Sequence, residues 1–397
     1  MIPQTYIIEY KRTPIGKYGG MLSAIRPDDL AAKSIKSVLE HQPTLDVTLV
    51  DDVIFGCANQ AGEDNRNVAR FASLLAGLPI EVPGVTTNRL CASGMQAIID
   101  SYARISSGLA DVLIAGGVES MSRAPYVMPK PSKAFDRNLE LSDTSLGWRF
   151  INPAFTKIYQ PFSMGETAEN IANRWNISRE SQDEFSLNSH QKYITSHAKG
   201  IFNEELINIF EEHNTILRDE NPRNDTSLQK LAQLKPAFVS NGSITAGNSS
   251  GLNDGAAAML LASDKFTQQH NLNPMAKIVS ATIVGVHPDI MGTGPIPAVQ
   301  KLLKQVNLSI SDIDLFEINE AYAVQVLHCI SELNINPSKV NINGGAIAIG
   351  HPLGCSGTRI IGHLALQLKR LNKRYGIATM CVGIGQGTAV LIENINL

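Results

Sequence analysis

"VTTNRLCASGMQAIID" (residues 85–100) begins with a β-branched run that breaks at Asn88, continues through a single cysteine at Cys91, and ends in an apolar helical pattern. The run predicts a short strand, and the pattern predicts a helix. Cys91 therefore stands at a strand-to-helix junction, and its small neighbours leave space around its sulfur: Ala92, Ser93 and Gly94. A lone cysteine in such a place is either a small buried residue or a nucleophile.

The rest of the chain alternates short apolar runs with segments of helical periodicity. This alternation predicts an α/β fold with mostly parallel, buried sheets. The runs that predict strands are DVIFG (52–56), VLIAGG (112–117), LFEIN (315–319) and GIATMCVG (376–383).

Two halves of the sequence resemble each other at one constant offset. VDDVIFG at 50 and IDLFEIN at 313 are 263 positions apart, and so are ASG at 92 and CSG at 355, each of which opens an apolar helix. A shared offset for separate elements indicates an ancient duplication. If the halves pack about a pseudo-twofold axis, the two loops that precede these helices meet near the centre.

Between the halves, roughly from 122 to 250, the composition changes. The segment is polar and rich in turn residues, and then becomes charged and helical, with Ser178 placed as an N-cap. We expect an insertion packed over the core.

Composition excludes several classes of protein. The 397 residues are 43% hydrophobic and 18% charged with a net charge of −3, which gives no general attraction to nucleic acid or anionic membranes. The sequence shows neither a membrane-spanning run nor the pattern of a signal peptide. An odd, scattered set of cysteines argues against a disulfide framework and predicts a reduced, cytoplasmic protein: Cys57, Cys91, Cys329, Cys355 and Cys381.

A helix start stabilises a thiolate through the helix dipole, which favours Cys91 as a nucleophile. A free cysteine has a pKa of about 8.5, so a base or a dipole is needed to make the thiolate available near neutral pH. His351 is the candidate base, since the glycine-rich loop NINGGAIAIGHPLGCSGTR (341–359) precedes the matching helix of the second half.

A third motif, ATMCVGIGQGTAVLIE (378–393), presents a second thiol, Cys381, beside the amide of Gly383. It is not a dinucleotide fingerprint, because a strand rather than a helix follows. Exposed amides suit the oxyanion of thioester chemistry. EINEAYA (317–323) ends a strand at Asn319 and Glu320, and Glu320 is equally well explained as a helix cap. Motifs for a metal or a nucleoside triphosphate are absent.

Five motifs, in this order and spacing, resemble those of thiolases: NRLCASGMQAI, GGVESMSRAP, NEAYA, GGAIAIGHPLGCSGTR and CVGIGQG. The resemblance covers essentially the whole chain. It implies a five-layered αβαβα fold made of two duplicated core halves and an inserted loop domain. The corresponding ranges are 1–121, completed by about 252–274, for the N-terminal half, 122–251 for the loop domain, and 275–397 for the C-terminal half.

The resemblance also implies a role for each catalytic residue. Cys91 would carry the acyl group, His351 would deprotonate Cys91, and Cys381 would exchange the α-proton of acetyl-CoA. Asn319 would hold a water that forms one oxyanion hole with His351, and the amides of Cys91 and Gly383 would form the other. A thiol at Cys381 favours the reversible Claisen reaction over the decarboxylating synthases of related fold.

Coenzyme A is implied as a substrate, with no tightly bound cofactor, no metal and a homodimer or homotetramer as the assembly. Phe238 is as well explained as a core residue. The positions that match family contacts to CoA or the acyl group are Arg223, Ser250, Met164, Phe238, Ala246 and Ala321.

Several segments resemble β-ketoadipyl-CoA thiolases, including FGCANQAGEDNRNVAR and DTSLGWRFINP. The implied reaction is thiolysis of 3-oxoadipyl-CoA to succinyl-CoA and acetyl-CoA. A general fatty-acid 3-ketoacyl-CoA or acetoacetyl-CoA thiolase is the alternative, and a non-catalytic CoA-binding scaffold is a distant one. Three positions depart from the family pattern: Gly165, Tyr322 and Asn221.

A terminal carboxylate on the acyl group would require a cation or several hydrogen-bond donors, since burying it unpaired costs several kcal/mol. Arg149, Arg123 and Lys130 are the candidates in the insertion. We favour Arg149, which Trp148 and Phe150 flank, although each cation is also explained as a surface or subunit contact.

Overall fold

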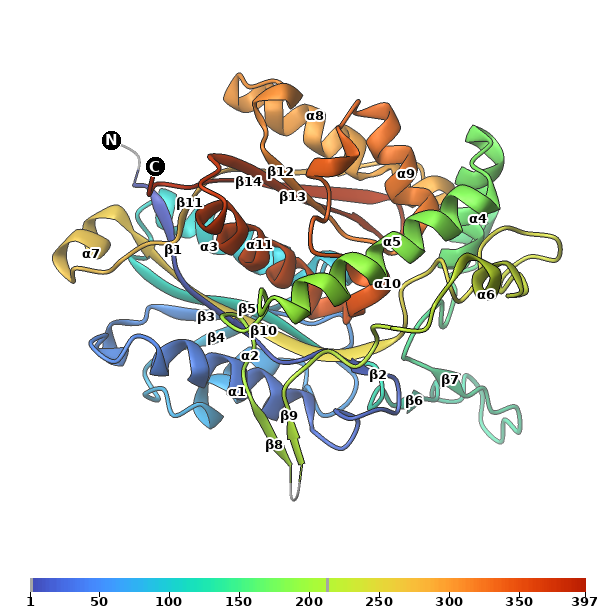
Figure 1. Cartoon of the computed structure of the whole chain (residues 1–397). Helices are drawn as coiled ribbons and strands as arrows, with labels where there is room; N and C mark the ends of the chain where they lie inside the picture. Colours follow the sequence, from blue (N-terminus) through green and yellow to red (C-terminus); the bar gives the residue numbers. More distant parts are fainter. Residues whose placement is uncertain (1–2, 212–213) are drawn as a thin grey trace.

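The computed structural model describes residues 3–211 and 214–397. Within them, one ten-stranded sheet runs through the molecule (Figure 1). Its order is β12 (Leu315–Ile318), β13 (Tyr375–Val382), β14 (Gln386–Glu393), β11 (Ala276–Gly285), β1 (Thr5–Arg12), β10 (Asn253–Ser263), β5 (Val112–Ser120), β3 (Asp52–Gly56) and β4 (Gly84–Thr87), with β2 (Gly16–Lys17) paired to β10.

The prediction of mostly parallel sheets is wrong, because the sheet is mixed. Among the described strands, parallel pairing occurs only between β3 and its neighbours β4 and β5, and between β12 and β13. The other pairs are antiparallel. The turn from β13 to β14 contains only residues 383–385, and so short a connection can join only antiparallel neighbours.

The strand arrangement repeats in the two halves, as the constant offset predicts. β3 starts at Asp52 and β12 at Leu315, while β5 starts at Val112 and β13 at Tyr375, which is the same offset of 263 residues. The series β3-β5-β10-β1 and β12-β13-β14-β11 have the same order and the same strand directions. The two series join where β1 pairs with β11.

Helices and sheet halves form five layers (Figure 1). α1 (Pro27–Glu40) and α2 (Val68–Leu75) cover the outer face of the first half. α3 (Ser93–Ser106) and α11 (Leu353–Arg370) lie side by side between the two halves. α8 (Pro295–Val306) and α9 (Ala323–Glu332) cover the outer face of the second half. The five-layered αβαβα architecture is therefore present.

The central contact between α3 and α11 depends on glycines. A Cβ atom on Gly94 would collide with the carbonyl oxygen of Gly354, and one on Gly357 would collide with the backbone of Met95. Gly56 and Gly117 likewise leave no room for a side chain against these helices. The backbones of both helix starts can approach closely only because these positions lack side chains.

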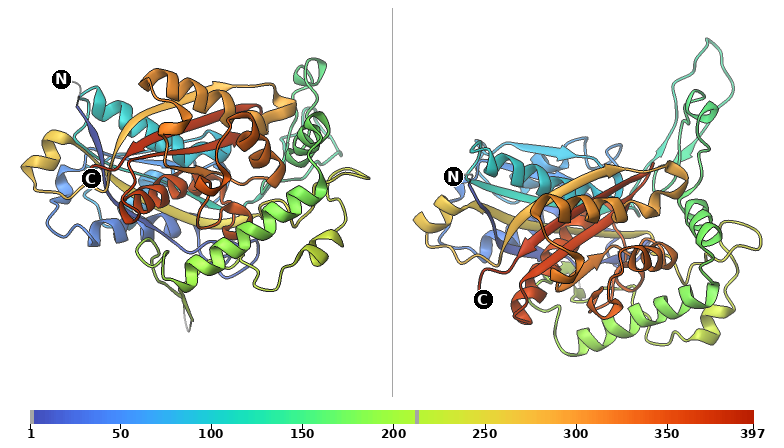
Figure 2. Two further views of the ribbon diagram at one scale, coloured as in Figure 1. Left: turned by 45° about the horizontal axis from the view of Figure 1, so that its top comes forward. Right: turned by 90° about the horizontal axis from the view of Figure 1, so that it is seen from above.

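The inserted segment lies along one side of the core. It contains β6 (Tyr126–Val127), β7 (Ser142–Asp143), α4 (Met164–Trp175), α5 (Arg179–Ala198), β8 (Ile209–Glu211), β9 (Asn214–Ile216) and α6 (Leu228–Ala232). Ser178 caps α5, as predicted. The right-hand view of Figure 2 shows the part between β5 and α4 projecting from the body.

β10 and α7 (Asp264–Gln269) return to the first half, and α10 (Ala346–Ile349) precedes α11. The division into three domains at residues 121 and 251 stays a prediction. Among the described helices, none combines the length and the apolar character needed to cross a bilayer.

Replacing Gly357 or Gly94 by alanine should lower the free energy of unfolding by about 1–3 kcal/mol, because the added carbon overpacks the contact between α3 and α11. Urea unfolding of each variant measures this loss. Gly285→Ala is the matched control, since the nearest atom to a Cβ there is 4.0 Å away. A Gly357→Ala variant with the wild-type midpoint would refute the claim that this contact is tightly packed.

Candidate active site

A strained turn presents Cys91 at the start of α3. Leu90, the preceding residue, has φ +48°, a left-handed conformation that is unfavourable for a leucine. Two hydrogen bonds hold this turn: the Leu90 amide donates to Asn88 Oδ1 at 2.8 Å, and Ser93 Oγ donates to the Leu90 carbonyl at 2.7 Å. The small residues after Cys91 therefore have two effects. Ser93 stabilises the turn, and Gly94 allows the close approach of α11.

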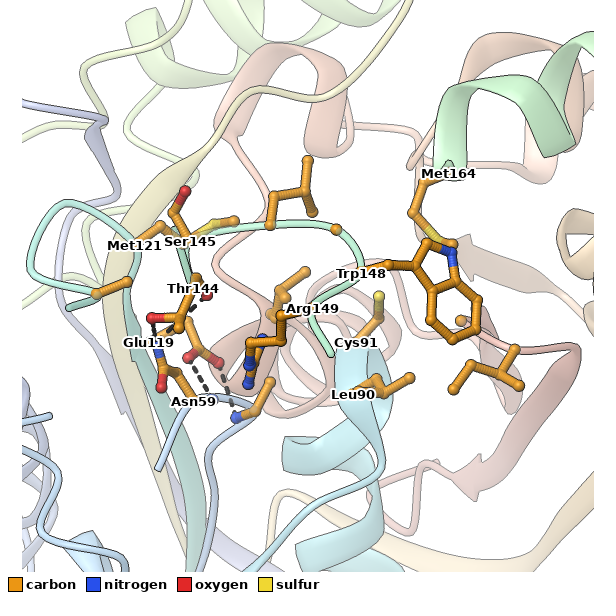
Figure 3. A pocket seen from close by; sticks show the side chains of 17 residues that line it. Asn59, Leu90, Cys91, Glu119, Met121, Thr144, Ser145, Trp148, Arg149 and Met164 are labelled. Carbon is orange, nitrogen blue, oxygen red and sulfur yellow. Dashed lines mark hydrogen bonds between the residues drawn. The ribbon is translucent and has the colours of Figure 1, made fainter. Parts of the chain in front are cut away.

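Cys91 opens into a cavity of about 150 Å³ (Figure 3). Its walls come from β5, from the inserted segment, from the start of α11 and from the β13–β14 turn. The lining includes Asn59, Leu90, Glu119, Met121, Thr144, Leu146, Trp148, Arg149, Met164, Leu353, Gly383 and Ile384. Two predicted site residues, Arg149 and Met164, thus share one cavity with Cys91 and Gly383.

The Cys91 thiol is not activated in the way the helix dipole suggests. Burial raises the pKa of Cys91 to about 11, although the amides of Gly383 and of Cys91 itself act in the opposite direction. The expectation of a dipole-stabilised thiolate is therefore wrong, because desolvation outweighs the dipole and the amides. Cys91 is a protonated thiol at neutral pH and needs a base.

Cys381 lies near the end of β13 and is buried. Burial raises its pKa well above the usual value, and the neighbouring thiols Cys91 and Cys329 act in the same direction. The following turn contains Ile384 and Gly385 with positive φ, and it brings the Gly383 amide to the Cys91 sulfur. The site therefore contains two protonated thiols in a low-dielectric environment.

His351 lies in the loop before α11, as Cys91 lies in the loop before α3, and at the offset of 263 residues its counterpart in the first half is Asn88. Its amide donates to Asn253 Oδ1 at 2.9 Å, and its ring is buried. Burial, together with the positive charge of Arg359, lowers the pKa of His351 to about 3. His351 is consequently neutral at neutral pH. Leu353, two residues further on, lines the cavity of Cys91.

Ser356 fixes which ring nitrogen of His351 carries the proton. Ser356 Oγ lies 2.6 Å from His351 Nδ1 and 2.9 Å from the Pro352 carbonyl oxygen. A carbonyl only accepts, so the single hydroxyl hydrogen of Ser356 points to Pro352, and Nδ1–H must donate to Ser356. Nε2 is then left as the basic nitrogen, 3.3 Å from the side-chain amide of Asn319.

Asn319 and Glu320 follow β12 and have different surroundings. Asn319 Oδ1 is buried and has no hydrogen-bond partner, so it is free to accept a hydrogen bond from a water or a ligand. Glu320 does not cap α9, whose N-cap is Tyr322. Its buried carboxylate instead accepts from Ser189 Oγ, from the Asn341 side-chain amide and from the Ile347 backbone. The helix-cap interpretation of Glu320 is therefore wrong.

The predicted CoA positions fall into two groups. Arg223 and Ala246 line a separate cavity of about 80 Å³, together with His190 and Ser249. Ser250 donates to the Ala321 carbonyl through both its amide, at 3.0 Å, and its hydroxyl, at 3.2 Å.

Phe238 is not a core residue, since it is 40% exposed. The Phe238 ring packs over Gly165, where an added Cβ would collide with it. It also contacts the Tyr322 ring edge-on, with 6.1 Å between the two ring centroids. Two of the three departures from the family pattern, Gly165 and Tyr322, therefore touch the same aromatic ring.

Sequence reasoning missed Ser356, Asn253 and Glu119 as parts of this site. The buried Glu119 carboxylate accepts three amides, from Ala58 at 2.9 Å, Asn59 at 3.0 Å and Gly354 at 2.8 Å. It thereby ties β5 to the start of α11. The one sequence signal that could have pointed to Glu119 is its position in the GGVESM motif. Among the described residues, no group of three or more metal-ligating side chains gathers.

Comparison with known proteins agrees with this geometry. A model described as the N-terminal domain of thiolase matches residues 5–265, and one described as the C-terminal domain matches residues 272–394. A β-ketoadipyl-CoA thiolase of Acinetobacter baylyi is 49% identical over 98% of this chain and 99% of its own length.

Two solved structures have nearly the same fold. An acetyl-CoA acetyltransferase of Bacillus anthracis has a TM-score of 0.93 at 40% identity and 99% coverage of both chains. A human mitochondrial 3-ketoacyl-CoA thiolase, solved in complex with CoA, has a TM-score of 0.92 at 38% identity, covering 99% of this chain and 98% of that one. The chain belongs to the thiolase family.

Proposed function

We propose that the protein cleaves 3-oxoadipyl-CoA with CoA to give succinyl-CoA and acetyl-CoA, through an acyl group carried on Cys91. The observation that carries the proposal is that the cavity-lining thiol of Cys91 lies near a second buried thiol, Cys381, and that the neutral His351 stands two residues before Leu353, which lines the same cavity. The substrate is supported by the β-ketoadipyl-CoA thiolase that is 49% identical over nearly the whole chain.

In the first half-reaction, His351 Nε2 takes the proton of Cys91, and the sulfur attacks the 3-oxo carbon of the substrate. The amides of Cys91 and Gly383 stabilise the oxygen that becomes negative. The bond between C2 and C3 breaks, and its electron pair forms the enolate of acetyl-CoA. A water held by Asn319 Oδ1, together with His351, stabilises that enolate, and Cys381 donates a proton to C2.

In the second half-reaction, the Cys381 thiolate takes the proton of the incoming CoA, whose sulfur attacks the acyl group on Cys91. Cys91 leaves as a thiolate and recovers its proton from His351. All protons return to their starting positions, so no external acid, base or redox partner is required.

CoA contacts belong to the same proposal. Arg223 and Ala246 would hold the nucleotide end in their separate cavity. Ser250, Ala321 and Phe238 would border the pantetheine arm, and Met164 would close the acyl cavity above Cys91.

We propose a homodimer or homotetramer as the assembly, as the sequence resemblance implies. β4 is an edge strand, which leaves backbone groups free for pairing with a second copy. The part of the inserted segment between β5 and α4, here called the projecting arm (residues 121–163), exposes many apolar side chains that an interface would cover. They are Tyr126, Met128, Phe135, Leu139 and Leu141. The cytoplasmic location stays a prediction.

Steady-state kinetics on two matched substrates test the function. 3-Oxohexanoyl-CoA differs from 3-oxoadipyl-CoA only in lacking the terminal carboxylate. We expect kcat/KM for 3-oxoadipyl-CoA to be higher by about 10-fold or more, the scale of a hydrogen bond to a charged group. The reverse preference would identify a general fatty-acid thiolase, and binding of CoA without any turnover would identify a scaffold.

Ser356→Ala should lower kcat about 10- to 100-fold with little change in KM, because Nδ1–H of His351 loses its buried partner at a cost of about 1–3 kcal/mol. Alkylation of Cys91 by iodoacetamide should slow in parallel, since the same nitrogen deprotonates the thiol.

Ser101→Ala is the matched control for this variant. Ser101 is also a fully buried helical serine whose hydroxyl donates to the carbonyl four residues earlier, at 2.8 Å. If both variants lose activity equally, or if alkylation of Ser356→Ala stays at the wild-type rate, Ser356 does not orient His351.

A further inference from the structure

Arg149 is an unpaired cation that lines the Cys91 cavity and is also exposed to solvent. It makes no hydrogen bond or ion pair with any residue in the described ranges 3–211 and 214–397. Its side chain reaches into the cavity onto which Glu119 and Cys91 also open (Figure 3). A guanidinium carries five donors in a planar fork that matches a carboxylate. An anion from the substrate would therefore supply the partner that the protein does not.

The other two candidate cations lack this arrangement. Arg123 is engaged by Glu63, with Nη2 donating to Oε1 at 2.6 Å, and by the Ser23 carbonyl at 3.2 Å. Lys130 is exposed on the projecting arm and does not line the cavity. Of the three, only Arg149 is both free and close to the nucleophile.

The cavity beside Arg149 is apolar on most of its wall, with Leu90, Leu146, Trp148, Met164 and Ile384 among the lining residues. Arg149, Leu146 and Ile384 are themselves exposed, so solvent reaches this end of the cavity. The apolar wall strengthens an ionic contact relative to bulk water, and the solvent screens it in part. Glu119 shares the cavity and forms no ion pair with Arg149 among the described residues; its carboxyl group accepts from the backbone amides of Ala58, Asn59 and Gly354.

The loop that carries Arg149 is fixed at both ends. On one side, the Asn59 side-chain amide donates to Thr144 Oγ1 at 2.9 Å, and the Asn59 backbone is itself held by Glu119. On the other side, Trp148 Nε1 donates to the Phe162 carbonyl at 2.8 Å. A charged side chain on an anchored loop loses less freedom on binding than one on a mobile loop.

We propose that Arg149 forms a carboxylate subsite that receives the distal end of the acyl group bound to Cys91, and that the Asn59–Thr144 hydrogen bond positions it. The subsite selects short acyl groups that end in a carboxylate. This inference rests on the proposed thiolase function and deepens it, since it names the side chain that binds the terminal carboxylate of the substrate.

The test compares wild type with Arg149→Met and Arg149→Lys on 3-oxoadipyl-CoA and 3-oxohexanoyl-CoA. We expect the ratio of the two kcat/KM values to fall about 10-fold or more in Arg149→Met, the scale of a lost hydrogen bond to a charged group, and to fall less in Arg149→Lys. Lys130→Met is the matched control, and its ratio should equal that of wild type.

The outcomes separate the two levels of the proposal. A wild-type enzyme that prefers 3-oxoadipyl-CoA, together with an unchanged ratio in Arg149→Met, would overturn the subsite alone. A wild-type enzyme that prefers 3-oxohexanoyl-CoA would overturn both the substrate and the subsite.

Thr144→Val and Thr144→Ser test the positioning role. Valine keeps the shape of threonine but removes the hydroxyl that accepts from Asn59, whereas serine keeps that hydroxyl. We expect Thr144→Val to raise KM for 3-oxoadipyl-CoA more than KM for 3-oxohexanoyl-CoA, and Thr144→Ser to restore the wild-type difference. Equal effects of both variants on both substrates would mean that Thr144 has only a structural role.

Discussion

The contact between the starts of α3 and α11 is the constraint on which the site depends. Gly94 and Gly357 bring the two backbones to a distance that no side chain would permit, and Gly354 packs just as closely against Val118 and Gly56. The two residues to which we assign the first steps of the reaction precede these helices, Cys91 just before α3 and His351 just before α11. In the proposed mechanism, this contact between the two halves brings the nucleophile of one half together with the base of the other. Glu119 strengthens this junction by binding the Gly354 amide from β5.

Burial then determines the protonation states of the two thiols and of His351. It raises the pKa of both thiols and lowers that of His351, so the three groups are neutral at neutral pH. A neutral resting site avoids the cost of buried, unpaired charge. In the proposed mechanism, charge appears only during reaction, when Cys91 gives its proton to His351, and the amides of Cys91 and Gly383 stabilise the oxygen that becomes negative.

Sequence patterns predicted the two halves and the elements that carry Cys91, His351 and Cys381, because the repeat and the periodicity can be read directly from the sequence. The resemblance to thiolases predicted the five layers. Strand direction was not predictable, since periodicity reports burial and not the sense of pairing. α11 shows a further limit. An apolar face on Ile361, Leu364 and Leu368 suggests an amphipathic helix, yet residues 354–368 are all buried because sheets cover α11 on both sides.

The chemistry of individual groups was harder to predict. The pKa of Cys91 depends on walls contributed by Trp148 and Gly383, which are distant in sequence. The tautomer of His351 depends on the helical turn that returns Ser356 to its ring. The choice of Arg149 over Arg123 depends on Glu63, which occupies Arg123. Such properties arise from tertiary contacts, and no single segment encodes them.

The central claim is that Cys91 and Cys381 divide the reaction between a nucleophile and an acid/base. The most direct measurement is peptide mapping of the Cys381→Ala variant after incubation with succinyl-CoA in the absence of acetyl-CoA. The account predicts a succinyl group on Cys91 and no conversion of 3-oxoadipyl-CoA by the same variant. A label on Cys355 or Cys329, or a variant that still completes thiolysis, would contradict it.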